Sequence, residues 1–210
     1  MHYFRPLYPY IFVLLILLST SAFNLIGAIN LLGQAILFTL VVCIPIWKTG
    51  RMSYVDIGWP WGLVLLGLIS LVFSDGHWLR SLIISLVVIL IGLRMGLGAL
   101  KFWQQGFLEK EFPRYQYQRV LWKKEGKENT ALALQVDAIS QGLANASFLA
   151  LPVFLIASNH SEKFSLIELA GLVIFILAFI MESVADYQKL AFLTKMKKEG
   201  KQKQVCNVGL

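Results

Sequence analysis

The stretch LIELAGLVIFILAFIMESVADYQKL, residues 166–190, joins a long apolar run to two carboxylates and an amine. An apolar run of this length is typical of a helix that crosses a bilayer, which needs ~20 residues. On such a helix Glu182 and Asp186 are one turn apart, and Lys189 follows on the same face. Ionisable groups near membrane depth are costly and often mark a functional site. A solvated helix end, from which Lys189 reaches the headgroups, is the alternative.

The whole chain has the composition of a membrane protein. Of its 210 residues, 57% are hydrophobic and 15% are charged, which is unlike an ordinary soluble domain. We therefore predict an all-α fold, a polytopic transmembrane helical bundle. The net charge of +7 is divided among the polar links, a pattern that fits membrane topology better than nucleic-acid binding. The two cysteines and three histidines are far apart in the sequence, so we expect neither a disulfide framework nor a metal site.

Six apolar segments predict six spans, at about residues 8–26, 31–47, 57–73, 79–100, 138–157 and 164–191. Residues 101–137 form the one long polar segment, in which basic and aromatic residues are interleaved. This pattern is typical of an amphipathic segment that lies along the lipid headgroups. We expect residues 1–210 to form a single integral membrane domain, with the lipid bilayer as its surroundings.

The basic residues also predict an orientation. Sixteen of the 19 lysines and arginines fall in the N-terminal head, the link at 48–56, the segment 101–137 and the C-terminal tail. All four regions lie on one side of a six-span chain, so the positive-inside rule places both termini in the cytoplasm. We expect a location in the bacterial inner membrane.

Three short motifs carry polar residues, two of them close to predicted span ends and the third within the segment 101–137. They are YVDIGWPWG at 54–62, GLRMG at 92–96 and EFPRY at 111–115. The topology puts Asp56, Arg94 and the pair at 182 and 186 near the cytoplasmic ends of their spans. We predict that these side chains converge in one cytoplasm-facing pocket, because a buried guanidinium needs a partner. A helix-capping Asp56 beside an aromatic belt is the alternative.

The ordered pieces VDIGW, GLR, EFPRYQ, QGL with LP, and ESVADYQKLAF with GL resemble a little-characterised bacterial membrane family. That family is grouped with the steroid 5-alpha-reductase C-terminal domain, and the resemblance covers Tyr54 to Leu210. It implies a membrane reductase that moves hydride from NADPH to an activated C=C bond of a lipid-like substrate, whether steroid, enoyl or isoprenoid. Asp186 falls where the wider superfamily has an acid that contacts the cofactor.

The resemblance also implies roles for particular residues. The residues expected to bind the cofactor are Arg94, Arg114, Glu182, Asp186 and Lys189. Tyr54 or Asp56 would polarise or protonate the substrate. The sequence has no glycine-rich nucleotide-binding loop, so a nucleotide would be held among membrane helices.

The chain departs from the family pattern at two places. Glu111-Phe112-Pro113 stands where the family has Glu-Asp, and the chain stops at Gly209-Leu210, before an expected RHPNY-like segment. We therefore expect it to be truncated. Two alternatives to the reductase remain open: an S-adenosylmethionine-dependent methyltransferase of the isoprenylcysteine or phospholipid type, and a non-catalytic membrane fragment. Substrate and oligomeric state do not follow from the sequence.

The topology leads to the first testable prediction. Cysteines placed at Ser161 and Lys198 should react with an impermeant maleimide from opposite sides of the membrane. Labelling of both positions from the same side would contradict the proposed orientation.

Overall fold

A computed structural model describes residues 3–106 and 109–200. The chain divides into two compact units, Met1–Ser161 and Glu162–Leu210, and each is described by itself. Their union in a single membrane domain stays a prediction. The point at which the chain stops, Gly209-Leu210, lies outside the described residues.

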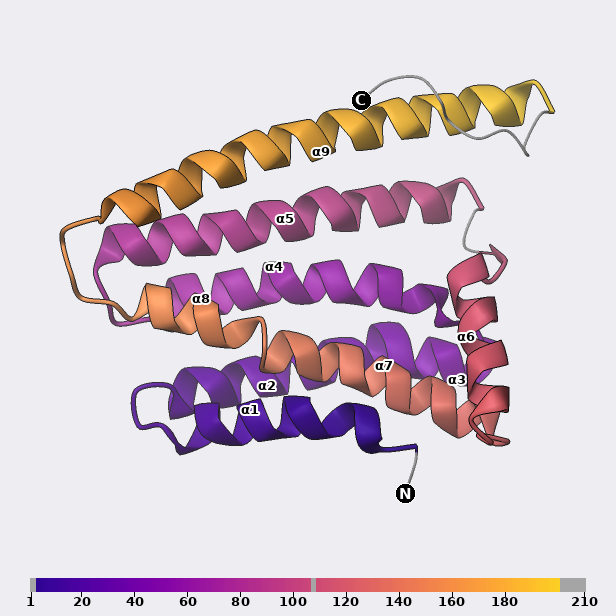
Figure 1. The fold of residues 1–210 in the computed structure, drawn as a ribbon, viewed down its shortest axis with the longest axis horizontal. Helices are drawn as coiled ribbons and strands as arrows, with labels where there is room; N and C mark the ends of the chain where they lie inside the picture. The colour runs from indigo at the N-terminus through magenta and orange to yellow at the C-terminus, as the bar shows by residue number, and fades with distance from the viewer. Residues whose placement is uncertain (1–2, 107–108, 201–210) are drawn as a thin grey trace. The chain divides into compact units, whose positions relative to one another are not determined.

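The described residues form helices, turns and no strands, which confirms the all-α fold. The helices of the first unit are η1 (Arg5–Leu7), α1 (Tyr8–Ser19), α2 (Asn24–Phe38), η2 (Thr39–Cys43), α3 (Ile44–Thr49), η3 (Met52–Tyr54), α4 (Val55–Phe73), α5 (Trp78–Gln104), α6 (Pro113–Lys124), α7 (Thr130–Ala146) and α8 (Ala150–Ala157). The second unit contains α9 (Leu166–Lys198). Figure 1 shows α6 running across the ends of the long helices of the first unit.

Five helical stretches in the described residues are long and apolar enough to cross a membrane. They are Asn24–Thr49, Met52–Phe73, Trp78–Gln104, Thr130–Ala157 and Leu166–Met196. The stretch Arg5–Ser19 is apolar but shorter. The protein is therefore a polytopic helical membrane protein. The apolar side chains that remain exposed along these stretches suit contact with lipid.

Several of the expected span boundaries differ from the helices observed: α2 begins at Asn24, not at residue 31, and α9 continues to Lys198, beyond residue 191. The first span was expected to reach residue 26, but α1 ends at Ser19, where the Ser19 and Thr20 hydroxyls both donate to the Ile16 carbonyl. Such local bonds offer the backbone an alternative to helix continuation. The fifth span was expected to begin at residue 138, whereas α7 begins at Thr130, with Asn129 accepting a hydrogen bond from the Leu132 N–H.

Helix α4 lies at the centre of the first unit, in contact with α2, α5, α7 and α8. Glycines bring the neighbouring helices close to it. A Cβ atom added at Gly58 would lie 2.2 Å from a Val42 methyl carbon, and one added at Gly92 of α5 would lie 2.6 Å from the Pro60 carbonyl oxygen. Helix association inside a membrane depends on such close packing, because lipid supplies no hydrophobic driving force between helices.

Three buried amides connect α2 and α7 to the backbone of α4. Gln34 Nε2 donates to the Gly62 carbonyl at 2.8 Å and to Asn30 Oδ1 at 3.2 Å. Asn145 Nδ2 donates to the Trp59 carbonyl at 3.0 Å, and Asn30 Nδ2 donates to the Asn145 carbonyl at 3.3 Å. All three side chains are at most 1% exposed. Interhelical amide bonds of this kind fix one helix against another in a membrane.

The close packing at Gly62 generates a second prediction. A Cβ atom there would lie 2.1 Å from Asn145 Nδ2 and 2.6 Å from Gln34 Oε1, so Gly62→Ala must displace the amides. We expect the variant to be destabilised by ~1–3 kcal/mol, the usual cost of overpacking. Thermal unfolding in detergent micelles would measure the loss.

Gly98 of α5 supplies the matched control, because a Cβ atom there meets nothing within 4 Å. Gly98→Ala should leave the stability unchanged or raise it by up to ~1 kcal/mol, since alanine is the better helix former. Equal melting temperatures for the two variants would contradict the packing at Gly62.

Candidate functional site

The candidate site is built on the turn between α3 and α4. Helix α3 ends at Gly50, whose φ of 68° is in the left-handed region that favours glycine at a helix end. Arg51 is extended, with φ −107° and ψ 128°, and the chain then enters η3 and α4. Tyr54 and Asp56, the two predicted catalytic residues, therefore lie at the very start of the central helix.

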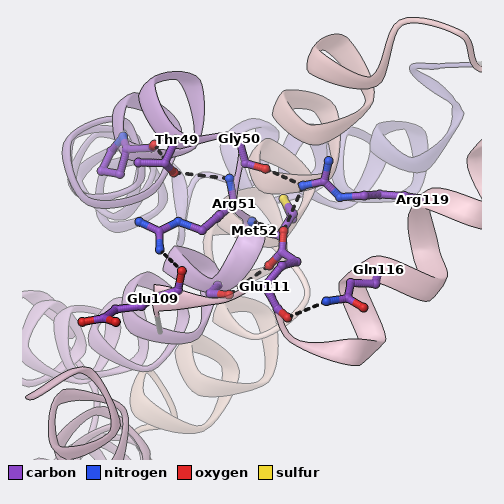
Figure 2. A network of polar contacts seen from close by, with 10 residues as sticks. Thr49, Gly50, Arg51, Met52, Glu109, Glu111, Gln116 and Arg119 are labelled. Carbon is purple, nitrogen blue, oxygen red and sulfur yellow. Dashed lines mark hydrogen bonds and ion pairs between the residues drawn. The ribbon is translucent and has the colours of Figure 1, made fainter. Parts of the chain in front are cut away.

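Glu111 binds this turn from a distant part of the chain (Figure 2). Its Oε2 accepts the Met52 N–H at 2.9 Å, and its Oε1 accepts the Ser53 hydroxyl at 2.9 Å. The first N–H groups of a helix have no partners within the helix, and a carboxylate there is also favoured by the helix dipole. Arg51 supplies no side-chain cap, so Glu111 performs the capping in its place.

Two arginines complete the connection between the turn and the segment 109–119. Arg119 pairs with Glu111 Oε2 at 2.9 Å and also donates to the Gly50 carbonyl. Arg51 Nη1 donates to the Glu109 carbonyl at 2.5 Å. The Glu111 side chain is 11% exposed and that of Arg119 is 29% exposed, so the pair is largely shielded from water.

Asp56 is held by the same segment, three and four residues further along. Its Oδ1 pairs with Arg114 and accepts the Tyr115 hydroxyl at 3.2 Å. The Arg114 guanidinium lies 4.9 Å from the centre of the Tyr115 ring and 5.4 Å from that of Phe112, which favours a cation. The structure thus brings together the predicted residues Asp56 and Arg114.

Two groups of α6 have shifted pKa values. Burial, reinforced by the Asp56 carboxylate, raises the pKa of the Tyr115 hydroxyl well above its ordinary range. Burial is the largest single effect on the Arg114 guanidinium and lowers its pKa, but the charges of Asp56 and Tyr115 and the hydrogen bonds to them together raise it more, so the net shift is upward. At neutral pH Tyr115 therefore keeps its proton and Arg114 keeps its charge.

One hydrogen-bond donor and one acceptor at the start of α4 have no partner within the described residues. The Tyr54 hydroxyl accepts a hydrogen bond from Arg51 Nη2 at 3.1 Å, which leaves its own proton available. Asp56 Oδ2 is buried and has no hydrogen-bond partner in the described part of the chain. A buried acceptor without a partner is costly, so both atoms are suited to binding a ligand.

Arg94, a predicted cofactor-binding residue, lies half-buried on α5. It sits between Gly92 and Gly96, which approach α4 closely at Pro60 and Trp61. Arg94 therefore belongs to the part of α5 that packs just after the first turn of α4.

Glu182, Asp186 and Lys189 lie on α9, in the second unit. The helix is continuous through these positions, so the three residues share one face, as the sequence spacing indicates. Their convergence with Asp56 and Arg94 in one pocket stays a prediction.

Glu111, Arg119 and Arg80 have structural roles that the sequence reasoning missed. Glu111 was considered only as part of the EFPRY motif and for its mismatch with the family pattern, and Arg119 only as a positive charge. Arg80, near the start of the fourth predicted span, was given no role, but it is 3% exposed and its Nε donates to the Ser161 carbonyl at 2.6 Å. In the sequence, Glu111 lies two residues before Pro113, which occupies the first turn of α6. An acid so close to a predicted helix start could have drawn attention to Glu111.

The fold and this site define a polytopic helical membrane protein with an arginine-rich polar site at one end of its first unit. The chain belongs to the family described as "Protein of unknown function (DUF1295)", whose model matches residues 42–210. The match includes every residue of the candidate site. Comparisons with curated proteins and with solved structures found no match.

The Tyr115 contact generates a third prediction. In an alkaline titration followed by tyrosinate absorbance, the wild type should contain a tyrosine that ionises later than the ordinary value of 10.0. That late component should disappear in Tyr115→Phe and persist in Tyr117→Phe, because Tyr117 is exposed.

The same shift gives stability a defined pH dependence. A pKa that folding raises contributes stability that is present below the unfolded value and is lost as the pH rises through the folded one. The unfolding free energy of the wild type should therefore fall more steeply above about pH 10 than that of Tyr115→Phe. Identical slopes would show that Tyr115 is not held in this environment.

Proposed function

We propose that the protein is a membrane-embedded oxidoreductase that uses NADPH to reduce an activated C=C bond in a lipid-like substrate. The observation that carries the proposal is the pair of unused groups at the start of α4, the Tyr54 hydroxyl proton and Asp56 Oδ2. An enone or enoyl reductase needs such a donor against the substrate carbonyl and an acceptor that orients a bound group.

Tyr54 is the better candidate for the donor to the substrate carbonyl. Arg51 donates to its hydroxyl oxygen and lies 5.7 Å from the centre of its ring. Because the Arg51 guanidinium is hydrogen-bonded to the phenol oxygen, it stabilises the negative charge that develops there when the proton moves toward the substrate. Asp56, in contrast, already accepts hydrogen bonds from Arg114 and Tyr115, so it is suited to orienting a ligand.

Two groups of the first unit are suited to bind parts of a dinucleotide. Asp56 Oδ2 is a buried acceptor without a partner, suited to an amide or hydroxyl group. The Arg114 side chain is 61% exposed although it pairs with Asp56, so part of its fork of donors remains available to phosphate. The proposal retains Arg94 and the α9 residues Glu182, Asp186 and Lys189 as further cofactor-binding groups.

The proposed reaction is balanced with one cofactor and one proton. When bound, NADPH would supply the hydride for the carbon β to the carbonyl, and with a proton taken up at the α carbon the double bond would become a single bond. The Tyr54 hydroxyl stabilises the oxygen that carries the negative charge between these events. The Asp56 side chain is 23% exposed, so the start of α4 is partly shielded from water, which strengthens that interaction.

The fourth prediction tests cofactor binding. NADPH at 100 times its dissociation constant should stabilise the protein by ~2.7 kcal/mol, which a melting assay in lipid nanodiscs detects. Asp56→Asn and Asp186→Asn should each weaken this response, because the isosteric amide keeps the packing and removes the charge. Glu162→Gln, a change at the start of the second unit, serves as the control and should respond as the wild type does.

Other outcomes of the same assay decide between the alternatives. Stabilisation by S-adenosylmethionine in place of NADPH would favour the methyltransferase. A protein that responds to neither compound would contradict both enzyme proposals and leave the non-catalytic alternative.

A further inference from the structure

We propose that Glu111 is the positioning residue of this site, and that its carboxylate fixes the turn from which Tyr54 and Asp56 project. The inference deepens the proposed function, on which its catalytic meaning rests. The contacts that carry it are independent of any ligand, since they lie entirely among residues 50–56 and 109–119 of the first unit.

Glu111 supplies the hydrogen-bond acceptors for two donors just before α4. The Met52 N–H and the Ser53 hydroxyl both donate to Glu111 at 2.9 Å, and Met52 and Ser53 are each 1% exposed. In the folded protein these two donors are therefore shielded from bulk water, and Glu111 supplies their acceptors. A buried N–H without an acceptor destabilises the conformation that buries it, so the turn depends on Glu111.

Glu111 also sets how the two stretches are aligned with each other. Glu111 binds residues 52 and 53, and Arg114 and Tyr115 of the same segment bind residue 56. Both sets of contacts join two short stretches that are far apart in the sequence. Because Glu111 fixes one stretch against the other, it determines where Arg114 and Tyr115 meet Asp56.

Two side chains of α6 hold Glu111 itself in place. Arg119, two turns later, pairs with Glu111 Oε2 and also donates to the Gly50 carbonyl, while Gln116 Nε2 donates to the Glu111 carbonyl at 3.0 Å. Figure 2 shows these residues arranged around the turn. Arg119 thus orients the carboxylate, and Gln116 holds the backbone of Glu111, before any ligand binds, as a positioning residue requires.

The test is hydrogen exchange of the backbone amides of residues 50–56, measured by mass spectrometry on the full chain in nanodiscs. Glu111→Ala should accelerate exchange of the Met52 amide roughly 10- to 150-fold, the factor that corresponds to the loss of a hydrogen bond to a charged group. Glu111→Gln keeps one acceptor oxygen and should give a smaller increase. Ser53→Ala removes only one of the two contacts and should accelerate exchange least, which keeps the test informative if Glu111→Ala does not fold.

Glu109→Gln is the matched control. The backbone carbonyl of Glu109, and not its carboxylate, accepts the bond from Arg51, so this variant should exchange like the wild type. Exchange at residues 50–56 that is the same in Glu111→Ala, Glu109→Gln and the wild type would overturn the proposal.

A second readout links the turn to the site. The late-ionising tyrosine assigned to Tyr115 should titrate earlier in Glu111→Gln than in Glu109→Gln, because the segment that carries Tyr115 is no longer held against Asp56. Faster exchange together with an unchanged tyrosine titration would show a purely local cap and overturn the positioning role. These readouts need no cofactor, so a failed NADPH response would contradict the proposed function and leave this result standing.

Discussion

The first unit depends on how closely its helices approach the backbone of α4. Inside a bilayer, apolar side chains gain nothing by leaving lipid for protein, so packing and hydrogen bonds must hold the helices together. Glycines at positions 58, 62 and 92 provide the close approach, and the buried amides Gln34 and Asn145 bond to carbonyl oxygens of α4. The geometry of the first turn of α4, where the candidate site lies, follows from this arrangement.

The polar site is connected to that scaffold through two stretches that meet only in the fold. One is the α3–α4 turn, and the other is the segment that leads into α6. Their contacts are bonds between charged groups and helix ends, and they lie where the apolar bundle gives way to polar links. Groups at such a boundary can be both dry enough to interact strongly and close enough to water to receive a soluble ligand.

Much of the fold could be predicted from the sequence, because lipid-crossing helices require long apolar runs. The same reasoning missed polar groups whose partners are distant. Asn30 and Gln34 lie in apolar runs, and nothing local indicates that they bond to α4 and α7. Arg80 looks like an ordinary cation at a span end, although it is buried against the Ser161 carbonyl.

For the candidate site, the motifs at 54–62 and 111–115 and the family resemblance drew attention to Asp56 and Arg114, but the contact between these residues depends on a pairing of distant stretches. Glu111 is the clearest case, since its role depends on two backbone atoms at positions 52 and 53. A single sequence carries no sign of which helix end a remote carboxylate will cap. The face shared by Glu182, Asp186 and Lys189 followed directly from helical spacing, because it involves one helix alone.

The pairing of the α3–α4 turn with the segment 109–119 limits the chain length between Glu111 and Arg114. Glu111 and Arg114 must remain three residues apart, because each has a fixed partner on the α3–α4 turn, and Pro113 between them begins α6. One residue inserted there would rotate every later side chain of α6 by about 100° and turn Tyr115 away from Asp56. In related chains, insertions should therefore be excluded from the short interval that follows Glu111.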